Sequence, residues 1–178
     1  MKILPLILGI IFTFILVGFI VYNIYVNYEY ERDVGAYFDN ARDCITPDCI
    51  LEQLNSGKQA IINNGLNEND YGAVWFKKPD NSMKFQYTHL NSIIERAQAV
   101  KDWKYKVYTE GNQAETFKDV YNEKMDNLRN YIHAEGYRSD WIAKHTWYIK
   151  NHIFMYFYPL TFIGLVLLIV LFFGLAFL

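Results

Sequence analysis

Two long apolar stretches lie at the ends of the chain, and the charged residues lie between them. No charged residue occurs from Ile3 to Tyr22 or from Ile153 to Leu178. A helix of about 20 apolar residues crosses the hydrocarbon core of a bilayer, so each stretch is long enough to span a membrane. We therefore expect transmembrane helices within residues 1–27 and 152–178, which leaves residues 28–151 outside the membrane.

The middle segment repeats apolar residues every three or four positions, as amphipathic helices do. The expected helices are a continuation of the first apolar stretch to about Arg42, then Pro47–Asn63, Thr88–Gly111 and Gln113–Gly136, and a last helix from Ser139 into the second stretch, kinked near Pro159. The predicted fold class is a mainly α membrane protein. N- and C-terminal transmembrane helices flank an extramembrane helical bundle.

One part of the middle segment breaks the helical pattern. The apolar run Ala73–Phe76 is followed by turn residues at Lys78–Asn81, and Met83–Tyr87 then alternates apolar and polar side chains. This alternation is typical of strands, so the pattern also allows a small β-hairpin packed on the helices. Trp103–Val107 alternates too, but it lies within a helical stripe. We predict helix there, with a strand as the alternative.

The two cysteines, Cys44 and Cys49, flank a helix start at Thr46-Pro47. Cys44 would end one helix and Cys49 would lie in the first turn of the next, within reach of a disulfide. We expect this bridge. The alternatives are two separate thiols and a metal site, although a metal site would still need further ligands.

The first apolar stretch resembles an uncleaved signal anchor more than a signal peptide. It is longer than an ordinary signal core, and no small-residue cleavage pattern follows it. A disulfide requires an oxidising compartment, so we place the central domain on the exoplasmic side, which is the periplasm in a bacterium. Arg138, Lys144 and Lys150 oppose this orientation, but the positive-inside rule weakens for connections longer than about 60 residues.

Charge and motifs exclude several classes of function. The chain has 17 Lys and Arg against 19 Asp and Glu, and all except Lys2 lie in the middle segment, so the basic excess of a nucleic-acid-binding protein is missing. The uncharged spans argue against an ion channel or pump. Without a phosphate loop or a nucleophile motif, we expect neither an enzyme nor a cofactor. A metal site of His133, Asp140 and His145 would require the chain to fold back at Gly136.

We predict a non-enzymatic accessory subunit that docks its helical domain on a larger membrane or envelope assembly. Its partners would be the lipid bilayer and a protein, which is expected to contact Trp75, Phe76 and Phe85 because these are large apolar groups on loop-like chain. The alternative is a small-ligand sensor with a pocket between helices near Trp103, Tyr105 and Tyr121. Lys101, Lys104 and Lys106 are interpreted as a solvated helix face, with lipid headgroups or an acidic partner as the alternative. No output domain is expected after the second span.

Overall fold

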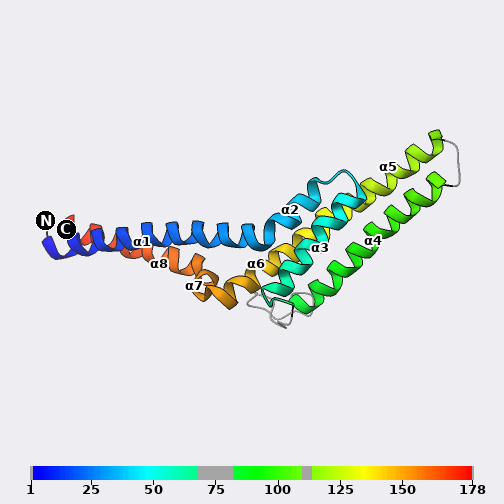
Figure 1. Ribbon diagram of the computed structural model, residues 1–178. Helices are drawn as coiled ribbons and strands as arrows, with labels where there is room; N and C mark the ends of the chain where they lie inside the picture. Colours follow the sequence, from blue (N-terminus) through cyan, green and yellow to red (C-terminus); the bar gives the residue numbers. More distant parts are fainter. Residues whose placement is uncertain (1, 68–81, 110–113, 178) are drawn as a thin grey trace. The chain divides into compact units, whose positions relative to one another are not determined.

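A computed structural model describes residues 2–67, 82–109 and 114–177 (Figure 1). The chain divides into two compact units, which are described separately. The terminal unit contains Met1–Glu29 and Tyr148–Leu178, and the central unit contains Tyr30–Trp147.

The described residues form helices and no strands. In chain order these are α1 (Ile3–Tyr30), the π-helical turn η1 (Glu31–Gly35), α2 (Ala36–Asp43), α3 (Pro47–Asn63), α4 (Met83–Thr109), α5 (Ala114–Tyr131), the π-helical turn η3 (Ile132–Gly136), α6 (Tyr137–Asn151), α7 (Ile153–Tyr156) and α8 (Tyr158–Phe177). The first helix is continuous from Ile3 to Asp43, as the apolar periodicity predicted.

The start of α4 corrects the predicted hairpin. Met83–Tyr87 is helical, while the other proposed strand, Ala73–Phe76, lies outside the described residues. The Ser82 hydroxyl accepts a hydrogen bond from the Phe85 backbone N–H (3.1 Å), so Ser82 caps a helix that was predicted to start at Thr88. Burial then follows a helical stripe rather than an alternation, along Met83, Gln86, Leu90, Ile93 and Ala97. Trp103–Val107 is also helical, within α4.

Local sequence signals set both ends of α3. The Thr46 side chain accepts from the Cys49 N–H (3.3 Å), and Pro47 occupies the first turn, where a missing N–H costs nothing. At the other end Gly65 adopts a left-handed φ of 60° and donates to the Ile62 carbonyl (2.8 Å). The predicted helix over Pro47–Asn63 is confirmed.

The expected break at Gly136 is wrong, because η3 carries the chain directly from α5 into α6. Ile132 and Gly136 are both buried, so one face of this turn packs against the core, while His133 and Ala134 are exposed on the other. Ser139 does not cap a new helix. It is fully buried within α6 and donates to the side-chain oxygen of the equally buried Gln86 (3.0 Å). Each side chain satisfies the other's need for a partner away from water.

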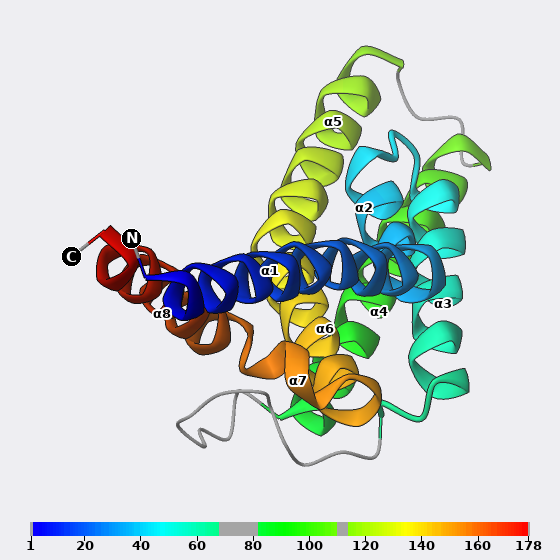
Figure 2. The ribbon, with the colours of Figure 1, turned by 90° about the vertical axis from the view of Figure 1, so that its left-hand side faces the viewer.

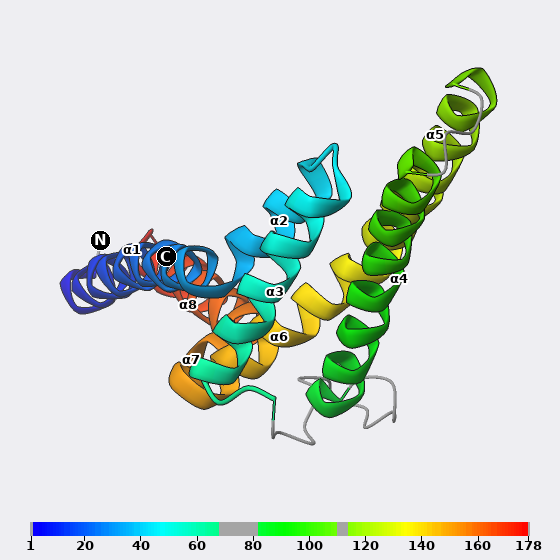
Figure 3. The ribbon, with the colours of Figure 1, turned by 45° about the vertical axis from the view of Figure 1, so that its right-hand side comes forward.

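In the central unit α2 packs on α3, α3 on α4, and α4 on α5. Figure 3 shows α4 and α5 running side by side and extending past α2 and α3. Gly57 permits the close approach of α2 to α3, since a Cβ there would lie 3.2 Å from the Cβ of Tyr37 and 3.3 Å from the ring of Phe38. The core side chains include Tyr30, Val34, Phe38, Ile50, Leu54, Ile61, Leu90, Ile93, Met125, Leu128, Ile132, Ile142 and Trp147.

In the terminal unit α1 and α8 lie side by side (Figures 1 and 2). Phe12 stacks on Phe172 and Phe19 on Tyr158, with ring centroids 5.5 and 5.0 Å apart. Both helices are long and apolar enough to cross a membrane. Their outer surfaces expose large apolar side chains, including Ile7, Ile10, Phe14, Val21, Ile163, Leu167 and Val170.

Candidate functional site

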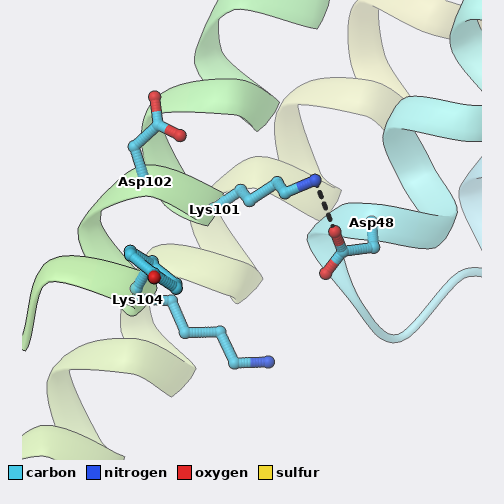
Figure 4. Close-up of a pocket in the computed structure, with 5 residues that line it drawn as sticks. Asp48, Lys101, Asp102 and Lys104 are labelled. Carbon is cyan, nitrogen blue, oxygen red and sulfur yellow. Dashed lines mark ion pairs between the residues drawn. The ribbon is translucent and has the colours of Figure 1, made fainter. Parts of the chain in front are cut away.

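A cleft of about 730 Å³ opens between the start of α3 and the second half of α4 (Figure 4). Its described lining residues are Asp48, Lys101, Asp102, Lys104 and Tyr105. Asp48 lies in the first turn of α3, directly after the Thr46-Pro47 start signal. Lys101, Lys104 and Tyr105 are spaced by three and four positions, which brings them to one side of α4.

One ion pair bridges the cleft. The Lys101 Nζ lies 2.7 Å from the Asp48 Oδ1, and this hydrogen bond lowers the pKa of Asp48 and raises the pKa of Lys101. Both side chains are exposed, so water screens the pair and it contributes little to stability. Asp102 accepts from the Gln98 amide (2.7 Å). Because the bridge across the cleft is weak, an incoming carboxylate could replace Asp48 on Lys101.

Among the described lining residues of the cleft, Tyr105 is the aromatic one, and it is 73% exposed. Trp103, which was grouped with it as a ligand-binding residue, lies about 200° away around α4. Trp103 and Tyr121 both stack on Phe117, with ring centroids 5.5 and 5.9 Å from that of Phe117. The structure thus brings Trp103 and Tyr121 together, but Tyr105 belongs to a different surface. Their joint ligand-binding role stays a prediction.

The residues predicted to contact a partner can be placed only in part. Phe85 lies in the first turn of α4, is 45% exposed, and has its ring 5.9 Å from the ring of His89. Trp75 and Phe76 lie outside the described residues. The proposed contact surface therefore stays a prediction, with Phe85 as its described member.

The predicted disulfide between Cys44 and Cys49 is present, with the two Cα atoms 5.6 Å apart. It closes the turn between α2 and α3. The bridge therefore constrains the start of α3, which carries Asp48 to the cleft.

A partly buried polar network was not anticipated from the sequence. The Tyr30 hydroxyl donates to the Asp140 Oδ1 (2.8 Å), and the Arg42 Nη2 lies 3.5 Å from the Asp140 Oδ2. Arg42 also pairs with Asp39 (2.6 Å). Burial raises the pKa of Asp140, while the hydrogen bond from Tyr30 and the charge of Arg42 act in the opposite direction. The network ties α6 to the segment that runs from the end of α1 into α2.

The histidines do not gather as a metal site would require. His133 is exposed, Asp140 belongs to the network, and the His145 Nδ1–H donates to the Trp141 carbonyl (2.8 Å). The helix continues through Gly136, so the fold-back that would join these residues does not occur. Among the described residues, no three His, Cys, Asp or Glu side chains are placed to hold a metal ion.

His145 predicts a pH dependence of stability. Burial lowers its pKa from 6.5, and the neighbouring Lys144 acts in the same direction. The unfolded chain therefore binds more protons than the folded one between the lowered pKa and about pH 6.5. The stabilising contribution is present above pH 6.5 and is lost as the pH falls through the folded pKa. Thermal melting, monitored by tryptophan fluorescence, should show that stability falls as the pH is lowered. The His145→Gln variant should lose less stability over the same pH range.

Asp140 provides the matching control. Its pKa is raised rather than lowered, so its effect on the pH dependence of stability has the opposite sign. Its contribution is present below about pH 3.8 and is lost as the pH rises through the folded pKa. Asp140→Asn should therefore leave the loss assigned to His145 in place. An unchanged pH profile in His145→Gln would contradict the assignment.

Comparison with known proteins finds no matching family model, no matching curated protein and no matching solved structure. Function is therefore argued from the chemistry of the sites themselves, as a fold alone would not define it in any case.

Proposed function

We propose that this protein is a non-enzymatic, two-pass membrane protein that docks its central unit on a protein partner in a larger membrane or envelope assembly. The apolar surfaces of α1 and α8 support the anchoring. Side chains such as Phe14 (74% exposed) and Val170 (66%) would meet water if these helices stood in solution. A bilayer would cover them, and exposed apolar surface of this extent is unusual on a soluble monomer.

The disulfide supports an exoplasmic position for the central unit, because such bridges persist in oxidising compartments. A membrane-impermeant maleimide should therefore label Cys44 and Cys49 in intact cells only after an impermeant reductant has been added. Cells carrying Cys44→Ser with Cys49→Ser provide the background. Labelling that requires lysis and no reductant would place the domain in the cytoplasm and contradict the proposal.

The observation that carries the docking proposal is the position of Tyr105 beside Lys101 and Lys104 on one side of α4. Tyrosine is enriched among the residues that dominate binding energy at protein interfaces. The Lys101 ammonium group favours a partner segment that presents a carboxylate next to an apolar side chain, while the Lys104 Nζ lies 5.2 Å from the centre of the Tyr121 ring. The carboxylate would displace Asp48 from Lys101, and the apolar group would cover Tyr105.

Purification from native membranes in a mild detergent tests this proposal. The wild-type chain should retain a protein partner in stoichiometric amount, and Lys101→Glu should lose it. Lys84→Glu is a matched control, since Lys84 is an exposed lysine in the first turn of the same helix. A wild-type protein that purifies alone, or equal retention by both variants, would contradict docking at the cleft.

A small-ligand sensor is the second candidate. It is favoured by the cleft volume, which falls within the range of about 300–1,000 Å³ that is usual for ligand sites. A ligand that raises the melting temperature of the wild type but not of Tyr105→Ala would support it. Trp103 and Tyr121 both stack on the Phe117 ring, which therefore occupies the space that a ligand shared by these two rings would need.

A further inference from the structure

A second cavity, of about 430 Å³, lies between the η1–α2 segment and α3 in the central unit. It has the volume of a small-molecule site but not the usual apolar lining. Hydroxyl, amide and paired charged groups dominate it. The described lining residues are Arg32, Asp33, Tyr37, Ser56, Gln59, Ala60, Asn63 and Asn64.

Helical geometry assembles this lining from two facing segments. Ser56, Gln59 and Asn63 follow one another at intervals of three and four residues, so they share one face of α3. Asp33 and Tyr37 are four residues apart on the opposite segment. Gly57 brings the two segments close, since a Cβ at this position would lie only 3.2 Å from the Tyr37 Cβ.

The charges of the described lining residues cancel, which favours an uncharged ligand. Arg32 and Asp33 form a two-pronged pair, with Nε to Oδ1 at 2.6 Å and Nη2 to Oδ2 at 2.9 Å. This hydrogen bonding lowers the pKa of Asp33, so the carboxylate stays ionised at neutral pH. An anion would meet Asp33 and a cation would meet Arg32, and neither would find an uncompensated opposite charge.

The neutral groups present donors and acceptors next to one another. The Gln59 Nε2 donates to the Asn63 Oδ1 (2.9 Å), which fixes both amides. The carbonyl oxygen of Gln59 is not used in this bond and neither is the amide group of Asn63, so the two side chains still offer an adjacent acceptor and donor. The hydroxyls of Ser56 and Tyr37 can each both donate and accept. A ligand that matches this arrangement carries closely spaced groups which also do both.

Neighbouring hydroxyls on a sugar ring are closely spaced, and each can both donate and accept a hydrogen bond. An extended peptide fits less well, since its N–H groups only donate and its C=O groups only accept, and each such pair along one edge repeats only about every 7 Å. The Tyr37 ring adds an apolar surface of the kind that can cover the C–H face of a sugar. We infer that this cavity is a carbohydrate-binding site for a neutral glycan. The inference is independent of the docking function, because it concerns a different surface.

The test uses the full chain in phosphatidylcholine nanodiscs, because detergents with sugar headgroups would compete for the site. Tri-N-acetylglucosamine and maltotriose are titrated by calorimetry. We expect saturable binding of at least one sugar with a Kd in the range of about 0.1–10 mM. A second set of nanodiscs carries a neutral glycolipid. Weaker binding of free sugar to these nanodiscs would assign the site to a lipid-borne glycan, and unchanged binding would assign it to soluble sugar.

Gln59→Ala with Asn63→Ala should weaken binding at least tenfold, because it removes the adjacent donor and acceptor. Asn40→Ala with Gln53→Ala is the matched control. Those side chains form an exposed amide pair between α2 and α3 (3.4 Å) that does not line the cavity, so this variant should bind as the wild type does. Three results would overturn the inference: no saturable binding by the wild type, equal binding by the Gln59/Asn63 variant, or preferential binding of a neutral tetrapeptide.

Discussion

Replacing Phe38 by alanine is expected to lower the free energy of unfolding of the central unit by about 3–5 kcal/mol. Phe38 is only 1% exposed, and its ring lies against Gly57 where α2 meets α3. Removing the ring loses its burial and leaves a cavity that the two helices cannot close without moving together. All four tryptophans of the chain lie within Tyr30–Trp147, so their fluorescence during denaturation reports on this unit.

Phe85→Ala is the matched control for this substitution. Phe85 is 45% exposed in the first turn of α4, so its loss should change the free energy of unfolding by no more than about 0.5 kcal/mol. Similar losses in the two variants would show that the α2–α3 contact is not a core contact.

Asp140→Ala is expected to lower the free energy of unfolding of the central unit by about 3 kcal/mol. The substitution removes the acceptor of the Tyr30 hydroxyl and one of the two carboxylates beside the partly buried Arg42. The cost of burying the Asp140 carboxylate, which raises its pKa, is relieved at the same time and offsets part of the loss. Denaturant titration of the full chain in nanodiscs would measure the difference.

Asp140→Asn separates the hydrogen bond from the charge. The amide oxygen can still accept from Tyr30, and no ionised group is buried at this position. We expect Asp140→Asn to lower the free energy of unfolding by about 1 kcal/mol or less. If the alanine and asparagine variants are equally stable, the hydrogen bond from Tyr30 contributes nothing and this account of the network is wrong.

Elements with local signals could be predicted from the sequence. Thr46-Pro47 and Asn64-Gly65 define the ends of α3, and both act through groups within a few residues of the helix terminus. The Cys44–Cys49 bridge spans the same turn. The absence of charge over about 20 residues at each end likewise identifies α1 and α8 without any tertiary information.

The wrong predictions concern positions where distant residues decide the structure. Five alternating residues, Met83–Tyr87, fit a strand as well as one helical turn, and the burial of Gln86 against Ser139 is a contact between residues 53 positions apart. Gly136 is a helix terminator in isolation. Here it is buried within η3, where glycine has room and keeps an ordinary helical φ.

Only the α4 side of the candidate cleft left a signal in the sequence. The sequence grouped Lys101 and Lys104 with Lys106 as a solvated helix face. It grouped Tyr105 with Trp103 and Tyr121 as ligand-binding residues, and no local pattern pairs Lys101 with Asp48. The network of Tyr30, Arg42 and Asp140 has no sequence signal either, since Tyr30 and Asp140 are 110 residues apart. Polar contacts between distant helices depend on how the apolar stripes pack.

Site-specific photo-crosslinking in native membranes tests the docking claim most directly. A photoreactive amino acid at position 105 should give a single crosslinked protein, because Tyr105 lies in the proposed interface and is 73% exposed. The same group at position 85 compares the cleft with the partner surface that the sequence predicted. Crosslinking from position 105 that Lys101→Glu abolishes is the result expected here. The absence of any protein adduct at position 105, with or without one at position 85, would contradict docking at the cleft.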